Sequence, residues 1–175
     1  MPPDLTNYIR DIPDFPKPGI LFKDITPLLG DPAALKAAVQ ALAAPYRQAS
    51  LTAVAAVESR GFIFASAVAC ELDCGFIPLR KPDKLPAATT SATYELEYGT
   101  DTIEVHTDAI RPGDRVAIID DLVATGGTAV AAVDLVKRLG GELVGCSFLI
   151  DLAFLGGAAR LAPCPVHTVI TYNGD

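Results

Sequence analysis

Residues 116–128 carry the sequence VAIIDDLVATGGT, and this stretch decides the fold class of the chain. Its first four residues are apolar and predict a buried parallel strand. The paired carboxylates Asp120 and Asp121 come where that strand is expected to end. A loop of small residues follows, and apolar side chains then recur at helical spacing from Thr128 to Leu139. Strand, loop and helix in this order are typical of an α/β fold.

The loop after the two carboxylates suits a terminal phosphate. Its backbone N–H groups lie at the start of a helix, where free donors and the helix dipole both favour an anion. Two glycines allow a close approach of the backbone, and two threonine hydroxyls add donors. The loop lacks the lysine of a Walker motif and the GxGxxG pattern of a dinucleotide site. The residues expected to hold the phosphate are Ala124, Thr125, Gly126, Gly127 and Thr128.

Asp120 and Asp121 are one step away from this loop and could accept hydrogen bonds from the hydroxyls of a sugar. A ribose 5-phosphate matches the spacing, with its phosphate on the loop and its hydroxyls on the carboxylates. The simpler alternative is an ordinary strand-to-helix turn with solvated aspartates, which is common in α/β folds.

Strands and helices alternate along the rest of the chain. We expect strands over 51–57, 75–79, 102–105, 142–150 and 166–171, and helices over 32–47 and 62–72. This order predicts a central, mostly parallel sheet flanked by helices, with ligand sites beyond the carboxyl ends of the strands. The loops expected to converge there are 58–61, 80–84 and 120–128, with Asp151 and Leu152 beside them.

The chain length favours a single domain over residues 1–175. Residues 1–30 are irregular and rich in proline, and we expect them to pack over the sheet as a cap. Residues 81–96 are polar and match no periodic pattern, so we expect a flexible loop.

Charge and hydropathy exclude several classes of protein. The formal net charge of −7 argues against a broad nucleic-acid interface. No apolar stretch is long enough for a membrane span and no signal peptide is visible, so we expect a cytoplasmic protein. A polyanionic substrate would need positive charge gathered locally or supplied by a metal ion. The basic residues beside the candidate loops are Lys23, Arg60, Arg80, Lys81 and Lys84.

Four cysteines are present, Cys70, Cys74, Cys146 and Cys164. They lie in apolar surroundings with neither a CxxC pair nor a histidine neighbour, which argues against a zinc site. We expect reduced thiols in the core or near the surface.

The sequence ESRGF, residues 58–62, places the guanidinium of Arg60 after a strand and at the start of a helix. Backbone donors combined with an arginine make a site for a second phosphate or a pyrophosphate. The alternative is a capped helix with a surface salt bridge.

Four segments together resemble a known family. IIDDLVATGGT resembles the phosphoribosyl pyrophosphate signature of type I phosphoribosyltransferases, and ESRGF resembles a pattern of the adenine phosphoribosyltransferases. FPKPGILFKDITPLL resembles the adenine-side segment of that family, and RKPDKLPAATTSATYELEYG resembles its mobile loop. The likeness extends from about Ile12 to about Pro165. Two positions depart from the family pattern, since Lys23 replaces a common arginine and Asp83 a common glycine.

The resemblance implies an enzyme that converts adenine and 5-phosphoribosyl 1-pyrophosphate to AMP and pyrophosphate in purine salvage. It further implies the type I fold with an N-terminal hood, a mobile catalytic loop, Mg²⁺ bound mainly through the donor, and a cytoplasmic homodimer. Two alternatives stay open. One is transfer to guanine, xanthine or orotate, although the apolar Leu152 favours adenine at the base slot. The other is a non-catalytic ligand sensor on the same fold.

The resemblance also implies roles for individual residues. Loop residues 124–128 would hold the 5-phosphate and the two aspartates the ribose hydroxyls. Glu97 would be the general acid or base, with Glu95 as its nearest rival, and Arg60 would also act in catalysis. The pyrophosphate would be held by Ser59, Arg60 and Lys81. The adenine slot would be formed by Leu21, Phe22, Lys23, Leu122 and Leu152, with the ring of Phe22 stacked on the base.

Overall fold

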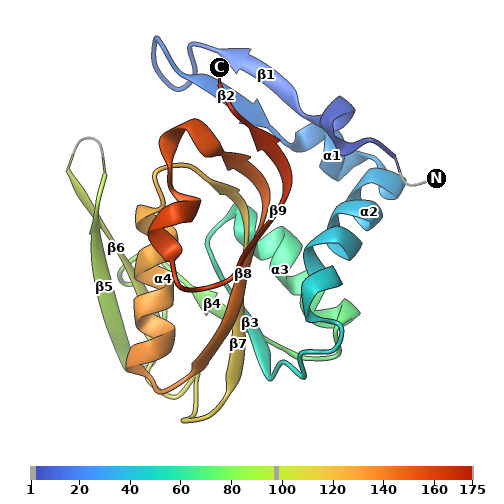
Figure 1. Cartoon of the computed structure of the whole chain (residues 1–175). Coiled ribbons are helices and arrows are strands. Elements are labelled where there is room, and N and C mark those ends of the chain that lie inside the picture. Colours follow the sequence, from blue (N-terminus) through green and yellow to red (C-terminus); the bar gives the residue numbers. More distant parts are fainter. Residues whose placement is uncertain (1–2, 97–98, 175) are drawn as a thin grey trace.

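A five-stranded sheet with the strand order β4-β3-β7-β8-β9 forms the centre of the computed structural model, which describes residues 3–96 and 99–174 (Figure 1). All neighbouring strands in this sheet are parallel. Their carboxyl ends therefore meet at one edge, where a parallel α/β sheet binds its ligands. The strands are β3 Ala53–Val57, β4 Gly75–Leu79, β7 Arg115–Val123, β8 Glu142–Leu152 and β9 Val166–Tyr172.

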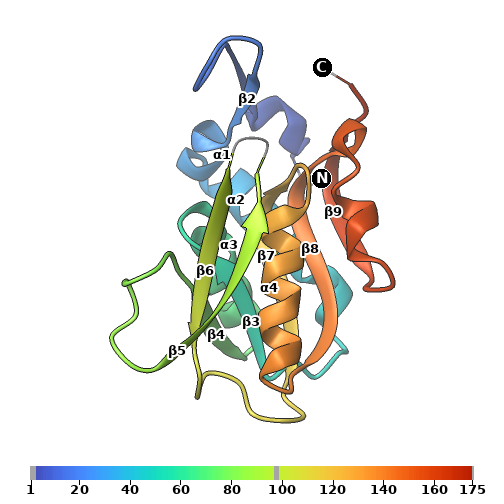
Figure 2. The same ribbon diagram turned by 90° about the vertical axis from the view of Figure 1, so that its left-hand side faces the viewer.

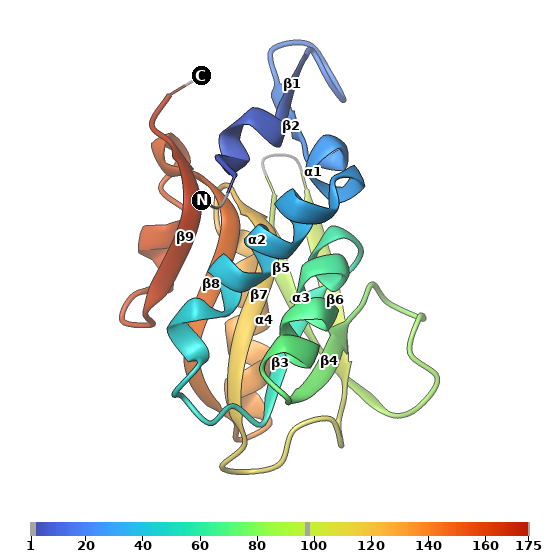
Figure 3. The same cartoon turned by 90° about the vertical axis from the view of Figure 1, so that its right-hand side faces the viewer.

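Helices cover both faces of the sheet. Helices α2 (Pro32–Ala43) and α3 (Arg60–Glu71) lie on one face, as Figure 3 shows. Helix α4 (Gly127–Arg138) lies on the other face together with an antiparallel hairpin of β5 (Thr89–Glu95) and β6 (Thr100–His106), seen in front in Figure 2. Strand β3 is buried along its whole length because side chains pack against both of its faces.

The sequence explains where helix α2 begins. Asp31 is its N-cap, and its carboxylate accepts hydrogen bonds from the backbone N–H groups of Ala33 (2.9 Å) and Ala34 (2.8 Å). Pro32 occupies the first helical position, as expected. The α-helix ends at Ala43 and continues as a 3₁₀ turn, η2 (Ala44–Tyr46), close to the predicted end.

The N-terminal segment contains regular structure that we did not predict. After a 3₁₀ turn, η1 (Leu5–Tyr8), strands β1 (Arg10–Pro13) and β2 (Leu21–Asp24) form an antiparallel hairpin, followed by the short helix α1 (Thr26–Gly30). We call the hairpin β1–β2 the hood. It lies beside the end of β9 in Figure 1, and the Lys23 ammonium is 4.1 Å from the centroid of the Tyr172 ring on that strand.

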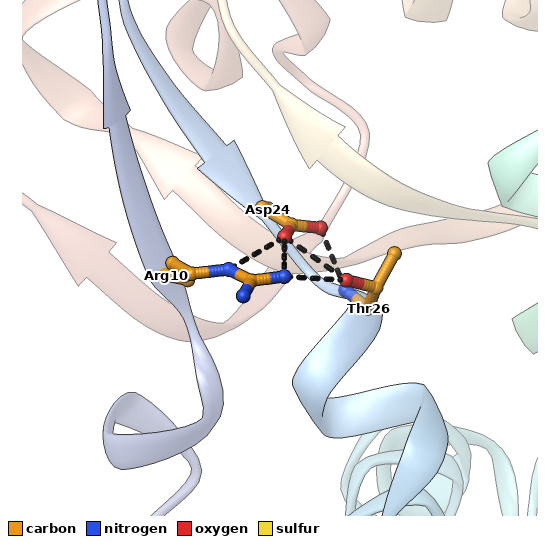
Figure 4. Close-up of polar contacts among 3 residues, drawn as sticks. All are labelled: Arg10, Asp24 and Thr26. Atoms are coloured by element: carbon orange, nitrogen blue, oxygen red, sulfur yellow. Dashed lines mark hydrogen bonds and ion pairs between the residues drawn. The ribbon is translucent and has the colours of Figure 1, made fainter.

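A polar cluster holds the base of the hood (Figure 4). The Arg10 guanidinium donates to the Asp24 carboxylate through Nε (3.0 Å) and Nη2 (2.7 Å). The same carboxylate accepts hydrogen bonds from the backbone N–H and the hydroxyl of Thr26, each at 2.9 Å. The Thr26 N–H and the Arg10 guanidinium lower the pKa of Asp24. The cluster joins both hood strands to the start of α1.

Two further predictions were wrong. Residues 81–96 are not irregular throughout, because β5 occupies 89–95 and pairs with β6. Only Ala92 and Tyr94 of that strand are buried. The other positions are mostly small polar residues, so the sequence lacks a clear alternation of apolar and polar side chains. Strand β7 also does not end at the carboxylates, since it includes Asp120 and Asp121 and continues to Val123. In the part of the chain that is described, no helix has the length and apolar character to cross a membrane.

Candidate active site

A cavity of about 260 Å³ opens at the carboxyl ends of β3 and β7. Its walls are formed by residues 57–61, which lead from β3 into α3, and by residues 120–129, which lead from β7 into α4. Two of the three loops expected to converge therefore do so. This is the position that the parallel topology favours for a ligand.

The loop 124–128 wraps around the start of α4. Gly126 is the N-cap residue, with a φ of +83° in the left-handed region that glycine adopts without strain. Its carbonyl oxygen accepts a 2.9 Å hydrogen bond from the N–H of Val130 and so begins the helix. The N–H groups of the first helical turn have no partner within a helix. They lie at the cavity, as an anion site requires.

Two residues outside the predicted site hold this loop in place. A Cβ on Gly126 would lie 2.6 Å from the carbonyl oxygen of Gly157, and a Cβ on Gly157 would overlap the carbonyl oxygen of Ala124. The guanidinium of Arg160 donates a 2.6 Å hydrogen bond to the carbonyl oxygen of Thr125. Because a peptide unit is planar, fixing this carbonyl also fixes the direction of the Gly126 N–H. The glycine pair at 156–157 was the only signal in the sequence for this contact.

The two carboxylates of β7 have different surroundings. A Cβ on Gly61 would lie 2.5 Å from Oδ1 of Asp120, so α3 approaches this carboxylate as closely as it does only because residue 61 is glycine. The same oxygen accepts a 2.9 Å hydrogen bond from the N–H of Asp121. Burial, followed by the charge of Asp121, raises the pKa of Asp120 well above its usual range.

Asp121 forms an ion pair with Arg60, whose Nε lies 2.9 Å from Oδ2. The Asp121 side chain is 7% exposed and the Arg60 side chain 39%. The contact lacks the alignment of a hydrogen bond, so within the described residues Oδ2 is a buried acceptor with no hydrogen-bond donor. Such an acceptor is costly unless a ligand satisfies it.

The loop 58–61 is joined to residues 80–81 through Glu58. Its Oε1 accepts hydrogen bonds from the backbone N–H of Lys81 (2.7 Å) and from Nε of Arg80 (3.1 Å). The peptide between Glu58 and Ser59 is cis. The third loop, 80–84, thus contacts Glu58 of the cavity wall through the Lys81 backbone and the Arg80 side chain, but none of its own residues lines the cavity.

Lys81 points away from the cavity toward the hairpin β5–β6. Its ammonium pairs with the carboxylate of Asp101 and lies 5.9 Å from the centroid of the Tyr94 ring. Although burial acts in the opposite direction, the hydrogen bond to Asp101 raises the pKa of Lys81. In this arrangement the Lys81 side chain is bound to Asp101 and does not line the cavity.

On the hood side, Phe22 approaches Arg60 of the cavity wall. Its ring centroid lies 5.1 Å from Cζ of Arg60, and its edge packs against Phe15 at the same centroid distance. Of the residues expected around adenine, only Leu122 lines the cavity, and Leu21, Phe22, Lys23 and Leu152 are not part of its described wall. Lys23 instead donates to Asp11 at 2.8 Å and packs on Tyr172 in the hood.

Glu97 lies outside the described residues. The strands on either side of it are described, and the hairpin they form packs against the start of α4. A Cβ on Gly127 would lie 3.0 Å from the carbonyl oxygen of Glu95 and 3.3 Å from the Tyr94 ring. The end of β5 therefore lies against the loop 124–128.

The described residues contain no group of three or more His, Cys, Asp or Glu side chains arranged to hold a metal ion. The carboxylates on the cavity wall are those of Glu58, Asp120 and Asp121, and Glu58 already accepts hydrogen bonds from Arg80 and Lys81. Mg²⁺ is usually bound by substrate phosphates together with one or two carboxylates. The site therefore fits a metal that arrives with a phosphorylated substrate.

The raised pKa of Asp120 has a measurable consequence for stability. Below the ordinary aspartate pKa the group is protonated in both states. As the pH rises from the pKa of Asp120 in the unfolded chain to its higher pKa in the folded chain, ionisation lowers the free energy of unfolding. Above the folded pKa this loss of stability is constant. Asp120→Asn keeps the acceptor for the Asp121 N–H, so thermal unfolding should show a Tm increase of about 3 °C or more at pH 7–8. The increase should vanish near about pH 3–4.

The exposed Asp108 offers a control, and Asp108→Asn should leave the Tm almost unchanged across this range. A lower Tm for Asp120→Asn at neutral pH would show that the carboxylate stabilises the fold, contrary to this assignment.

Comparison with known proteins identifies the relatives of this chain. The profile of the phosphoribosyl transferase domain matches residues 29–158. The adenine phosphoribosyltransferase of Rhodopirellula baltica is 55% identical over 172 residues, which cover 98% of this chain and 84% of that protein. That of Thermobifida fusca is 54% identical over 167 residues, or 95% of each chain.

Solved structures agree with these relatives. Adenine phosphoribosyltransferase from Rhodothermus marinus superposes with a TM-score of 0.92 at 57% identity over 96% of both chains. The Saccharomyces cerevisiae enzyme, complexed with an imino-altritol bisphosphate and adenine, has a TM-score of 0.90 at 38% identity over 95% of this chain and 96% of that one. The expected fold class is confirmed.

Proposed function

Because this chain belongs to the adenine phosphoribosyltransferases, we propose where in its cavity each of the two substrates of that reaction binds. The enzyme joins adenine to the ribose of 5-phosphoribosyl 1-pyrophosphate, forming AMP and releasing pyrophosphate in purine salvage. One observation carries the proposal: the helix N-terminus at 124–128 and the carboxylates of Asp120 and Asp121 line the same cavity as Arg60.

The 5-phosphate of the donor binds at the start of α4. The backbone N–H groups of residues 124–128 supply donors, the helix dipole favours the negative charge, and the Thr125 and Thr128 hydroxyls add hydrogen bonds. The supporting segment at Gly157 and Arg160 keeps these donors in position before the substrate arrives. Such preorganisation reduces the cost of ordering the loop on binding.

The ribose lies above the end of β7. Asp121 Oδ2 has no hydrogen-bond donor among the described residues, and a ribose hydroxyl would satisfy it. Asp120, beside it, accepts from the second hydroxyl. As the bond to pyrophosphate breaks, positive charge develops on the ribose, and the two carboxylates offset that charge.

The pyrophosphate lies against residues 58–61. Arg60 is the cation on the cavity wall, and the backbone around Ser59 adds N–H donors at the start of α3. Mg²⁺ bound to the donor would neutralise part of the charge on the leaving pyrophosphate. Lys81 reaches the pyrophosphate only after its ion pair with Asp101 breaks. Binding of the pyrophosphate by Lys81 is therefore coupled to movement in residues 81–96.

Adenine binds between the hood and the end of β7. Phe22 stacks on the base, and Leu122 supplies an apolar wall. Like Phe22, the residues Leu21, Lys23 and Leu152 do not line the present cavity, so all four reach the base only if the hood closes further over it. Glu97, which follows β5 in the chain, exchanges the proton with the imidazole ring of adenine.

Base specificity is tested by measuring AMP formation with adenine and the corresponding products with guanine, xanthine and orotate, each with and without Mg²⁺. Turnover should occur with adenine and require the metal. Faster turnover with another base would identify a different acceptor. Tight binding of the donor with no turnover on any base would favour a ligand sensor.

The support of the phosphate loop gives a quantitative prediction. Arg160→Ala removes the hydrogen bond to Thr125 and should raise the KM for the donor roughly 5- to 30-fold, corresponding to about 1–2 kcal/mol. The kcat and the KM for adenine should change little, because the loop contacts only the phosphate end of the donor. Steady-state kinetics with each substrate varied in turn checks this.

Arg160→Lys, which keeps the charge, should restore part of the affinity. The matched control is Arg47→Ala. Arg47 forms a 2.8 Å ion pair with Glu71, and neither residue lines the cavity, so the loss of Arg47 should not alter the KM for the donor. An unchanged KM in Arg160→Ala would remove this residue from the phosphate site.

We also propose a cytoplasmic homodimer, on the basis of the family resemblance. Sedimentation should then show a particle of about twice the 18.3 kDa chain mass.

A further inference from the structure

Two cysteines far apart in the sequence meet at the amino ends of β8 and β9. The Sγ atoms of Cys146 and Cys164 lie 3.7 Å apart. Cys146 is fully buried in β8, whereas Cys164 is partly exposed in the segment that precedes β9. The backbone around the two residues is tied together, because the Cys146 N–H donates a 2.9 Å hydrogen bond to the carbonyl oxygen of Pro165.

We propose that Cys146 and Cys164 form a reversible dithiol–disulfide site, in which a hydroperoxide oxidises Cys164 first and Cys146 then resolves it. The site is separate from the substrate cavity, whose wall contains neither cysteine. The roles of the two cysteines follow from their difference in exposure, because the oxidant reaches the partly exposed Cys164, whereas the buried Cys146 is positioned only to attack its neighbour.

The hydrogen bonds around the pair support this division. The Cys164 thiol can donate to the carbonyl oxygen of Pro165, which leaves the Cys146 thiol to donate to the Cys164 sulfur. That bond lowers the pKa of the Cys164 thiol, and the charge of Lys137 acts in the same direction. The same bond, together with burial, raises the pKa of Cys146. Cys164 is therefore the better nucleophile.

The chemistry balances with hydrogen peroxide as the oxidant. The Cys164 thiolate attacks one peroxide oxygen, an S–O bond forms, the O–O bond breaks, and the second oxygen leaves as hydroxide, which takes up the one proton released by the Cys164 thiol and becomes water. The Cys146 sulfur then attacks the Cys164 sulfenic acid, an S–S bond forms, and hydroxide leaves and takes the Cys146 proton to become water. Two thiols have lost two electrons and two protons, and the peroxide has become two waters.

The test begins with the reduced full-length protein. After treatment with hydrogen peroxide and alkylation under denaturing conditions, the titratable thiols should fall by two from the four of the chain. Peptide mapping should show a Cys146–Cys164 link with a loss of about 2 Da, reversed by dithiothreitol. This measurement needs no variant. A product in which Cys70 or Cys74 is oxidised first, or in which no such link forms, would overturn the proposal.

Two variants assign the order of the steps. In Cys146→Ser, the sulfenic acid should accumulate at Cys164 and react with dimedone. In Cys164→Ser, both dimedone labelling and the link should be lost, whereas Cys70→Ser should behave like the wild-type chain because Cys70 is exposed on α3 and distant from the pair. Dimedone labelling of Cys146 in Cys164→Ser would show that the buried cysteine reacts first.

Discussion

Replacing Glu97 by glutamine should lower kcat roughly 10²- to 10⁴-fold, the range typical of a lost general acid or base, while the KM for the donor stays near its original value. The amide keeps the size of the side chain but can no longer carry the proton that adenine exchanges when it attacks the ribose. Although Glu97 lies outside the described residues, β5 before it ends against the start of α4. Strands β5 and β6 flank Glu97 in the chain, and their hairpin packs beside the loop 124–128. Single-turnover kinetics with saturating donor measures this directly.

Glu95 provides the matched control, since it lies two residues earlier and is exposed at the end of β5. Glu95→Gln should retain nearly full turnover. Equal losses in the two variants would mean that the effect arises from the hairpin as a whole, and full turnover in Glu97→Gln would transfer the role to another group.

Replacing Arg60 by methionine should lower kcat about 10²- to 10³-fold, the effect expected when one donor to a developing negative charge is removed. Arg60 stands on the cavity wall between Asp121 and Phe22, with Nε 2.9 Å from the carboxylate and Cζ 5.1 Å from the centroid of the aromatic ring. It thus contacts both halves of the proposed site. Methionine preserves the apolar stem but removes the charge that stabilises the leaving pyrophosphate.

Arg60→Lys should recover part of the loss, because a lysine restores the charge but not the planar, bidentate guanidinium. The effect on kcat should exceed the effect on the KM for adenine, and varying each substrate separately shows this. Arg47→Met is the control for an arginine in an ion pair away from the cavity. A wild-type kcat in Arg60→Met would exclude Arg60 from the transition state.

The central sheet was predictable because its strands are short apolar runs between clear stop signals. Strand β4 has the predicted bounds, 75–79, and the Asp31 cap marks the start of α2. Strand β5 was missed because only two of its seven residues are buried and the others are mostly threonine and serine. Strand β7 continues through Asp120 and Asp121 because it is paired with β8 on one side up to Val123. Pairing of this kind is not visible in local hydropathy.

The site was predictable where it depends on the parallel topology, and not where it depends on contacts between distant side chains. Loops 58–61 and 120–128 meet because both follow parallel strands of one sheet. The side chain of Lys81 was expected near them, but the hairpin brings Asp101 within its reach and the ion pair holds it there. Arg160 could not be assigned, because its partner is a backbone carbonyl that any sequence offers.

The contact between Gly126 and Gly157 shows that the proposed phosphate-binding element is built from two pieces of chain. Residues 116–128, transferred alone to another α/β protein, would carry every group that we assign to the phosphate and still lack the segment that shapes the loop. A designer would have to transfer 156–160 with it and reproduce the spacing between them. A search for the loop motif alone would likewise select chains in which the second piece is missing.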